Sequence, residues 1–592
     1  MISMRRILKL VFFTVVFLPV MALGCIDVNL GGNTMLSDYQ LYLPKAYDAN
    51  RSRSYPTIYI LGSDKLTDIE RIGICKTLDK NVLIEPLITV FVSADKWLKD
   101  DSIDIVLYAR DLVETAIHYV DKHYNSRSER DGRLLIGGYA AAAYGLTHPD
   151  IFKGVITLNF PGLFDENQRK EYLLAHSIAK YVEQPERIPI YIVAGEDKPC
   201  SDHENTLQQF YTNQVNYNMQ AVQLYQQLHR TNIFQQQFNK YDRVPASPAE
   251  LRIMNGNGVK KAYLNGIEEG LKYFFAYSGK PVQLEYDVSR YQTKQKGLIE
   301  KKTSSIRKSL AITKTEHIPL AYKIYLPYGY DDERNIHYPV LYLLHGSGGN
   351  EKSWNKFFAI LDAMIERRLI PRLIAVAPIT GNSYWIDSNK YGAVESSIIQ
   401  ELIPEVDSHY RTISHRSGRG VLGFSMGGYG ALRYTLAYPE LFSSAVLLSP
   451  AIQHGDPPTT SGAVKRGAFG VPFSFKKWKM LNYPLTLKSY LKQKQRTPIY
   501  IITGDDEWNH ASEKTDLPID ASRYNMEMQA ATLYQHLIQS TEGDLEQCIQ
   551  NLAELNIING GHDMGVWAKG FELGIEYIFD HGFAKPRQDK VH

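Results

Sequence analysis

The sequence predicts an α/β protein of two tandem domains, each a mostly parallel sheet with helices on both faces. Two observations predict this fold class. Short runs rich in Val, Ile and Leu alternate with amphipathic stretches, and the runs are apolar throughout, as in strands covered on both faces. A series of similar segments also occurs twice along the chain, in the same order. Strands that alternate with helices form mostly parallel sheets, so each copy predicts one α/β domain.

Length and charge agree with this organisation and exclude one class of function. A chain of 592 residues exceeds what one hydrophobic core supports, so two or three domains are expected. The composition is 44% hydrophobic and 22% charged, with a formal net charge of +2. An electrostatic nucleic-acid binder needs a basic surface, so no nucleic-acid partner is expected.

The N-terminus has the layout of a secretory signal peptide. In "MISMRRILKLVFFTVVFLPVMALGC" a basic start precedes a short apolar run and then small residues. The small residues Ala22 and Gly24 fit cleavage that releases the protein, whereas "ALGC" resembles a lipobox in which Cys25 bears the lipid. We expect an exported protein, periplasmic or extracellular, that meets a membrane only if Cys25 is lipidated. The alternative is a buried first helix.

Four cysteines do not make a disulfide framework in a chain of this length. Cys75 and Cys200 fall in one half and could pair, whereas Cys548 stands alone in the other. No Cys/His spacing resembles a metal site, and the sequence implies no metal or organic cofactor.

The repeated segments set the domain boundaries. "YQLYLPKAYD" answers "YKIYLPYGYD", "YVDKHYNS" answers "EVDSHYRT", and "IPIYIVAGED" answers "TPIYIITGDD". Between the halves lies a stretch rich in Lys, Gln and Ser, typical of a linker or an edge hairpin. The predicted division is a signal peptide over 1–24, a first domain over 28–279, the linker or hairpin over 280–308, and a second domain over 309–582.

A nucleophile is predicted in the second copy. "GFSMGG" follows the strand "RGVL" and precedes the helix "YGALRYTLAYP", and Gly-x-Ser-x-Gly between a strand and a helix is the nucleophile elbow. The turn presents the Ser425 hydroxyl to the cleft, and the helix N-terminus favours developing negative charge. The alternative is a glycine-rich turn with an incidental serine.

A serine nucleophile needs a histidine base and an acid that orients it. In folds with a nucleophile elbow the acid follows the serine along the chain, and the histidine follows the acid. His562, in "INGGHDMGVW", comes directly after the last predicted strand and is the candidate base. The acid is expected on the loop of "PIYIITGDDEW", where Asp505, Asp506 and Glu507 compete.

The oxyanion donors are expected from the loop "LLHGSGG" after the first core strand. The backbone N–H groups of Ser347 and Met426 form the predicted pair. The alternative is a plain glycine turn.

From Thr313 to Phe579 the second half resembles the esterase-D-type esterases of the α/β-hydrolase fold. That group includes S-formylglutathione hydrolases and feruloyl, acetyl-xylan and siderophore esterases. The resemblance is carried by "YLPYGYD", "YPVLYLLHGSGG", "GNSYWIDS", "QELIPEVDSHYRT", "GFSMGGYGALR", "TGDDEW" and "GGHDMGVW". It implies two tandem α/β-hydrolase domains and a Ser-acid-His triad. In that family the acid is usually an Asp at the position that Glu507 holds here.

The first copy has lost the predicted chemistry. Ala140 aligns with Ser425, Gly258 with His562 and Lys198 with Glu507, and the turn after "IYIL" lacks the His-Gly-Ser-Gly-Gly loop. Asp506 matches an aspartate in this copy, where no triad exists. We therefore favour Glu507 as the acid, with Asp506 as the alternative, and expect the first domain to be a binding module, a lid or platform, or a scaffold.

The expected function is that of an exported serine esterase that forms an acyl-enzyme on a small-molecule or polysaccharide-linked ester. Tyr384 and Trp385, in "GNSYWIDS", are candidate substrate-binding residues that could stack on a sugar or aromatic acyl group, and core packing is the alternative. Two other functions stay open. One is acyl transfer to a sugar or lipid hydroxyl, and the other is a non-catalytic binding protein.

Overall fold

The computed structural model forms two compact units, which are described separately. Unit 1 comprises Met1–Thr157, Gly162–Ile188 and Ile267–Pro281, and unit 2 the rest of the chain. The structure describes residues 39–47, 53–61, 68–80, 84–92, 105–159, 177, 180, 181, 188–195, 221, 222, 224, 225, 228, 249–254, 259–275, 286–305, 317–332, 334–493, 495–507, 525–539 and 553–583. The predicted signal peptide, Cys25, Lys198, Cys200 and Gly258 lie outside these ranges.

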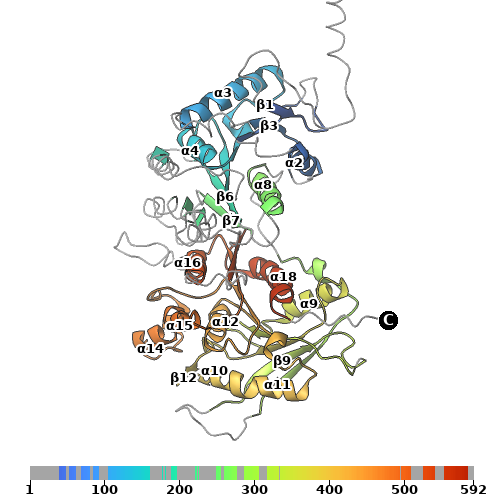
Figure 1. Ribbon diagram of the computed structural model, residues 1–592, viewed down its shortest axis with the longest axis vertical. Coiled ribbons are helices and arrows are strands. Elements are labelled where there is room, and N and C mark those ends of the chain that lie inside the picture. The colour runs from blue at the N-terminus through green and yellow to red at the C-terminus, as the bar shows by residue number, and fades with distance from the viewer. Residues whose placement is uncertain are drawn as a thin grey trace, which may run out of the picture. The chain divides into compact units, whose positions relative to one another are not determined.

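Unit 2, whose strands β6, β7 and β9 are labelled in Figure 1, is built on a mostly parallel sheet. The strand order of this sheet is β6-β7-β17-β16-β15-β14-β10-β11-β9-β8. From β17 to β11 all neighbours are parallel, whereas β7 runs antiparallel to β17, and β9 antiparallel to both β11 and β8. The strands are β6 (Ile190–Ala194), β7 (Ala249–Ile253), β8 (Leu298–Thr303), β9 (Ala321–Leu326), β10 (Val340–Leu344), β11 (Ile374–Pro378), β14 (Arg419–Phe424), β15 (Ser444–Leu448), β16 (Ile499–Gly504) and β17 (Ala553–Ile558).

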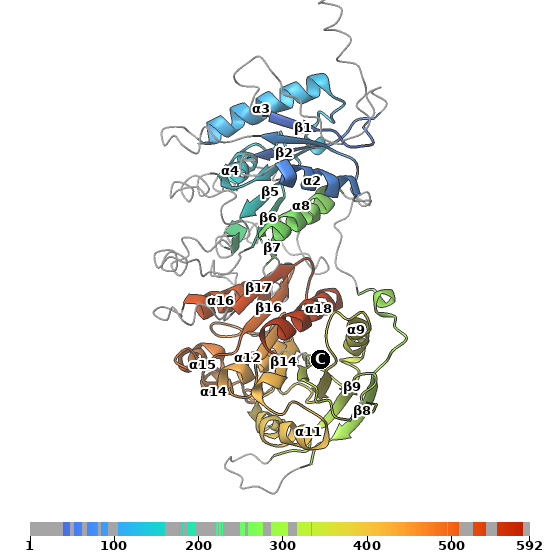
Figure 2. The ribbon, with the colours of Figure 1, turned by 45° about the vertical axis from the view of Figure 1, so that its right-hand side comes forward.

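Helices cover both faces of this sheet (Figure 2). On one face α9 (Asn355–Glu366) and α18 (Met564–His581) pack with alternate strand residues into a buried core that includes Leu343, Phe357 and Phe571. On the other face lie α12 (Met426–Ala437) against β14 and β15, and α16 (Met526–Gln539) against β16 and β17. The parallel strands thus bring the loops at their carboxyl ends to one edge, where ligands bind in this fold class.

Shorter elements complete unit 2. They are β12 (Asp387–Ser388), β13 (Gly392–Ala393), α10 (Val394–Ser397), a π-helix (Ile398–Leu402), α11 (Ile403–His409), α13 (Gly462–Lys465), α14 (Phe475–Leu481), α15 (Tyr483–Tyr490), and 3₁₀ turns at Val288–Tyr291 and Arg416–Gly418. Of these, α15 packs on α12.

Unit 1 has the strand order β1-β3-β2-β4-β5, with β1 antiparallel to β3 and the other neighbours parallel. The strands are β1 (Tyr39–Tyr42), β2 (Thr57–Leu61), β3 (Ile88–Val92), β4 (Arg133–Gly137) and β5 (Gly154–Asn159). Its helices are α2 (Asp68–Lys80), α3 (Ile105–His123), α4 (Tyr139–Thr147), the end of α8 (Val259–Phe275), and a 3₁₀ turn at Arg130–Gly132. The same order and directions recur in unit 2 over β9-β11-β10-β14-β15.

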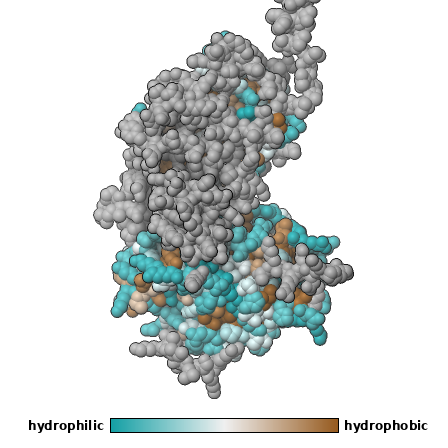
Figure 3. All heavy atoms as spheres, viewed as in Figure 1, coloured by the Kyte–Doolittle hydropathy of each residue, from teal (hydrophilic) through white to brown (hydrophobic). Residues whose placement is uncertain are grey.

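The predicted α/β class is confirmed, because the strands are mostly parallel, buried on both faces and covered by helices, whereas the tandem arrangement of two α/β-hydrolase domains stays a prediction. On the face drawn in Figure 3, hydrophilic residues cover most of the described surface and hydrophobic residues form separate small patches. Among the described residues, no helix has the length and apolar character needed to cross a membrane.

Candidate active site

Ser425 is the single residue between β14 and α12, and its backbone has a conformation that few L-residues adopt. It follows the last residue of β14 and caps α12, with φ 55° and ψ −119°. A non-glycine residue in this region costs on the order of 1–3 kcal/mol and persists only where its surroundings hold it. Here the Ser425 N–H donates to Leu448 O at 2.9 Å, and the Ser425 carbonyl accepts from Ala451 N at 2.9 Å. The neighbouring strand therefore fixes the turn.

The glycines beside Ser425 are required by close backbone approach. A Cβ on Gly423 would collide with the Gly427 carbonyl, and a Cβ on Gly427 would collide with the carbonyl of Leu344 at the end of β10. The Gly-x-Ser-x-Gly spacing is thus explained by the path of the chain, which lays the start of α12 against the end of β10.

The structure brings Ser425, His562 and Glu507 together from three separate loops. His562 Nε2 lies 2.9 Å from Ser425 Oγ, and His562 Nδ1 lies 3.2 Å from Glu507 Oε2. Since a carboxylate only accepts, Nδ1 carries the proton and Nε2 presents its lone pair to the serine hydroxyl. His562 lies between β17 and α18, and Asp563 caps α18 by accepting from Gly565 N and Val566 N.

Glu507 is fully buried and held at its other oxygen. Glu507 Oε1 accepts from Gly504 N at 2.9 Å and from the Ser449 hydroxyl. The second oxygen is left to face the histidine. Ser449 directly follows the neighbouring strand β15 and has φ 42°, and no motif in the sequence predicted its hydrogen bond to Glu507.

Among the described residues, neither of the other two candidate acids on this loop forms a hydrogen bond with His562. Asp505 is buried, pairs with Arg252 and accepts from Gly560 N at 3.0 Å. Burial, and then the charge of Asp505, raise the pKa of Asp506 to about 7. Within the described ranges, no three His, Cys, Asp or Glu side chains are grouped so as to hold a metal ion.

The loop after β10 lies beside the serine, as an oxyanion loop must. A Cβ on Gly346 would lie 3.3 Å from Ser425 Cβ. In the part of the chain that the structure describes, neither the Ser347 N–H nor the Met426 N–H donates to a protein acceptor. Asn382 Oδ1 holds this loop by accepting from Ser347 Oγ at 2.6 Å and from Gly348 N at 2.7 Å.

His345 ties this loop to the next one and was not singled out by sequence reasoning. It is fully buried, and burial lowers its pKa to about 4, so the ring is neutral. His345 Nδ1 donates to Gly346 O at 2.8 Å, and Nε2 accepts from Thr380 N at 3.0 Å. A histidine that opens a glycine-rich loop after a strand is the signal that could have identified it.

Tyr384 and Trp385, the predicted substrate-binding pair, lie in the core. Their exposed fractions are 3% and 0%, and both adopt positive φ values. Trp385 Nε1 donates to His345 O at 3.1 Å, and its ring packs against Gly430 of α12. Of the two open interpretations, the structure places these side chains in packing, where Trp385 also holds the loop after β10 through His345.

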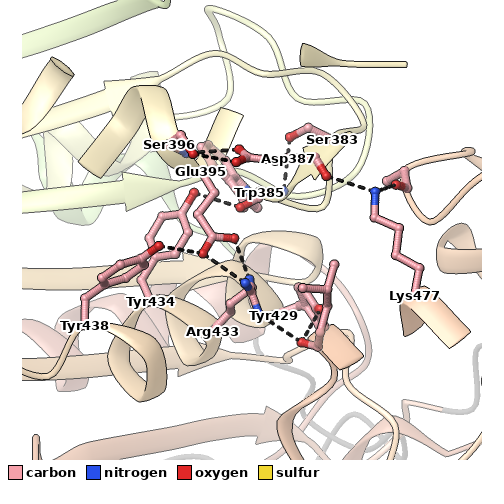
Figure 4. Close-up of polar contacts among 12 residues, drawn as sticks. Ser383, Trp385, Asp387, Glu395, Ser396, Tyr429, Arg433, Tyr434, Tyr438 and Lys477 are labelled. Carbon is pink, nitrogen blue, oxygen red and sulfur yellow. Dashed lines mark hydrogen bonds and ion pairs between the residues drawn. The ribbon is translucent and has the colours of Figure 1, made fainter. Parts of the chain in front are cut away.

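A polar network fixes this loop on α12 (Figure 4). Tyr434 donates to Trp385 O at 2.8 Å, and Arg433 forms an ion pair with Glu395, with Nε 2.5 Å from Oε2. The Tyr438 hydroxyl donates to the same carboxylate at 2.9 Å. The helix that begins at Ser425 therefore also anchors the loop that carries Tyr384 and Trp385.

Comparison with known proteins relates part of this chain to esterases. Residues 318–572 match the model of the family described as "Putative esterase". An endo-1,4-beta-xylanase/feruloyl esterase of Xylanibacter ruminicola is 38% identical over 136 residues, which is 21% of this chain and 19% of that protein. An esterase of Mycobacterium tuberculosis, Rv1288, is 36% identical over 115 residues, 18% of this chain and 24% of that protein.

The aligned region thus spans only about a fifth to a quarter of the length of these curated relatives. Among solved structures, the feruloyl esterase module from Clostridium thermocellum complexed with sinapinate is 20% identical. It covers 52% of this chain and 97% of that one, with a TM-score of 0.35.

Proposed function

We propose that the protein hydrolyses carboxylic esters through an acyl-enzyme on Ser425. The observation that carries the proposal is the unbroken chain from Ser425 Oγ through His562 to Glu507, with distances of 2.9 and 3.2 Å. The family of residues 318–572 supports ester chemistry independently of this geometry.

In the first step Ser425 Oγ attacks the ester carbonyl carbon while His562 Nε2 takes the hydroxyl proton. The buried Glu507 carboxylate stabilises the imidazolium that forms and holds the ring in the required tautomer. The N–H groups of Ser347 and Met426 donate to the oxyanion of the tetrahedral intermediate.

In the second step His562 returns the proton to the leaving alcohol, and the acyl group stays on Ser425. His562 then removes a proton from water, which attacks the acyl carbonyl and releases the acid. The serine recovers its proton, so the cycle consumes one ester and one water.

We also propose that the protein is exported by its N-terminal segment, with lipidation at Cys25 as the alternative to release. The proposed substrates are small-molecule or polysaccharide-linked esters. The name of the Xylanibacter ruminicola relative, which pairs xylanase and feruloyl esterase activities, supports the polysaccharide-linked class.

The first copy of the repeat, residues 28–279, is proposed to be inactive, and residues 309–582 to be the catalytic copy. Equivalent ion pairs support the repeat: Arg133–Asp121 at 2.5 Å in unit 1 and Arg419–Asp407 at 2.6 Å in unit 2. Each aspartate also accepts from a hydroxyl, of Ser126 or Thr412, at the same relative position. These matching contacts support a repeated scaffold, in which the first copy has Ala140 at the position that aligns with Ser425.

A fluorophosphonate probe tests the proposal directly. The wild-type protein is expected to be labelled at Ser425 alone and to hydrolyse at least one member of a panel of aryl, acetyl-sugar and thioester substrates. Ser425→Ala should abolish both, and a labelled Ala variant would refute the assignment. Product analysis with an added sugar or lipid acceptor separates hydrolysis from acyl transfer, because transfer makes a new ester instead of the free acid.

A further inference from the structure

The loop that carries Glu507 is joined by a buried ion pair to a strand far away in the sequence. Arg252 Nη1, on β7, contacts Asp505 Oδ2, and both side chains are 1% exposed. The guanidinium also donates to Leu251 O at 2.9 Å, and its Cζ lies 5.0 Å from the Tyr191 ring centroid. Arg252 Nη2 also pairs with Glu250 Oε2 at 3.4 Å, so the guanidinium is held from several sides between two carboxylates.

Asp505 connects the loop of the proposed acid with the loop of the proposed base. Its Oδ1 accepts from Gly560 N at 3.0 Å, and its own N–H donates to Ile558 O at 3.0 Å. Asp506 N donates to Gly560 O, also at 3.0 Å. Since Glu507 comes two residues after Asp505 and His562 two residues after Gly560, these contacts set how the two side chains meet.

The surroundings of Asp505 make a cation necessary. Glu250, Asp506 and Glu527 lie near it, and for each the pKa is raised, first by burial and next by the charge of Asp505. Glu527 reaches the acid loop itself, because its Oε2 accepts from Glu507 N at 3.3 Å. A buried carboxylate needs a paired, hydrogen-bonded partner, and among these acidic groups Arg252 provides it.

We propose that Arg252 is a positioning residue for the triad: through Asp505 it holds the Glu507 loop against the His562 loop. The inference rests on the proposed function. The proposal assigns a part in catalysis to β7, which belongs to the first copy in the sequence. In the structure β7 lies in unit 2 and pairs with β17.

The test compares Arg252→Met with a matched ion-pair variant, Arg419→Met. Arg419 is 5% exposed on its side chain and pairs with Asp407 at the opposite end of β14 from Ser425, so its loss removes a similar contact away from the triad. Arg252→Met is expected to lower kcat about 10²-fold with KM nearly unchanged, because small displacements of reacting groups cost that much. Arg419→Met should lower the melting temperature and leave kcat near the wild-type value.

A second variant keeps the test decisive if Arg252→Met does not fold. In Arg252→Met/Asp505→Asn both charges of the Arg252–Asp505 ion pair are removed, and the amide oxygen of the new asparagine can still accept from Gly560 N. Its kcat should exceed that of Arg252→Met about tenfold, or lie within about tenfold of the wild type where the single variant is unfolded. The proposal is overturned if the two arginine variants lose kcat equally, or if the folded double variant shows no recovery.

Hydrogen–deuterium exchange gives a readout that does not need turnover. The Gly560 amide should exchange faster in Arg252→Met than in Arg419→Met, and unchanged protection would contradict the proposal. A wild-type protein that neither binds the fluorophosphonate probe nor hydrolyses esters would instead refute the proposed function, while the exchange result would still judge the coupling of the two loops.

Discussion

The turn between β4 and α4 and the turn between β14 and α12 join equivalent elements but differ in backbone conformation. In unit 1, Gly138 caps α4 in an extended conformation, with φ −79° and ψ −151°, and the helix runs from Tyr139 through Ala140. In unit 2 the helix begins only at Met426, and Ser425 stands before it at φ 55°. The residue aligned with the nucleophile thus lies within a regular helix in one copy and on a strained elbow in the other.

The glycine pattern differs in the same sense. Gly427 is required beside the Leu344 carbonyl, whereas the aligned position in unit 1 is Ala142, a buried helix residue whose N–H donates to Gly138 O at 3.1 Å. A backbone held at positive φ is unfavourable and is kept where it does something useful. The difference teaches that the elbow is tied to the hydroxyl it presents, while the strand and helix around it belong to the scaffold.

The largest expected effect comes from removing the proposed nucleophile of the second copy. Ser425→Ala should lower kcat about 10⁶-fold, because nucleophile, base and acid act as a unit. Adding Ala140→Ser to that variant should restore neither turnover nor probe labelling, because position 140 lies inside α4 and the aligned base and acid positions hold Gly258 and Lys198. Labelling at residue 140 would show that the first copy keeps a base elsewhere.

The second effect concerns the acid. Glu507→Gln should lower kcat on the order of 10⁴-fold, because the amide no longer fixes the tautomer or stabilises the imidazolium. Asp506→Asn should cost far less, since among the described residues His562 Nδ1 meets the carboxylate of Glu507 and not that of Asp506, whose main-chain N–H still donates to Gly560 O. Steady-state kinetics on one aryl ester check both, and the reverse ranking would transfer the acid's role to Asp506.

The sequence was sufficient to predict those features of the fold and the site that depend on short motifs and on residues at strand ends. It predicted the parallel sheet, and it put Ser425, His562 and Glu507 at the carboxyl ends of β14, β17 and β16, where the structure brings them together. It did not find Ser449 or Arg252, which belong to no motif and act through contacts that exist only once the strands are paired. Nor could it decide whether Trp385 faces substrate or core, because an aromatic side chain suits either place.

A third prediction uses His345, which has no counterpart in the turn of the first copy. Burial holds its pKa at about 4, below the unfolded value near 6.5, so the unfolded chain binds more protons between those pH values. Stability therefore falls as the pH drops from 6.5 to 4, by at most about 3 kcal/mol from this group. Denaturant unfolding across this range should show a shallower loss for His345→Gln, and identical slopes would mean that other groups cause it.

The smallest effect concerns the oxyanion loop, which the first copy also lacks. Asn382 Oδ1 accepts from Ser347 Oγ and Gly348 N, so it restrains the loop without touching the reacting atoms. Removing a whole oxyanion donor costs about 10²- to 10³-fold in kcat, and a loosened donor should cost less, about tenfold for Asn382→Ala. Asn382→Asp keeps an oxygen that can accept both hydrogen bonds and should retain most of the activity. The rate of fluorophosphonate labelling should fall in parallel with kcat, because both reactions build negative charge at the same N–H groups. If Asn382→Ala raised KM alone, Asn382 would act on substrate binding and not through its hydrogen bonds to the loop after β10.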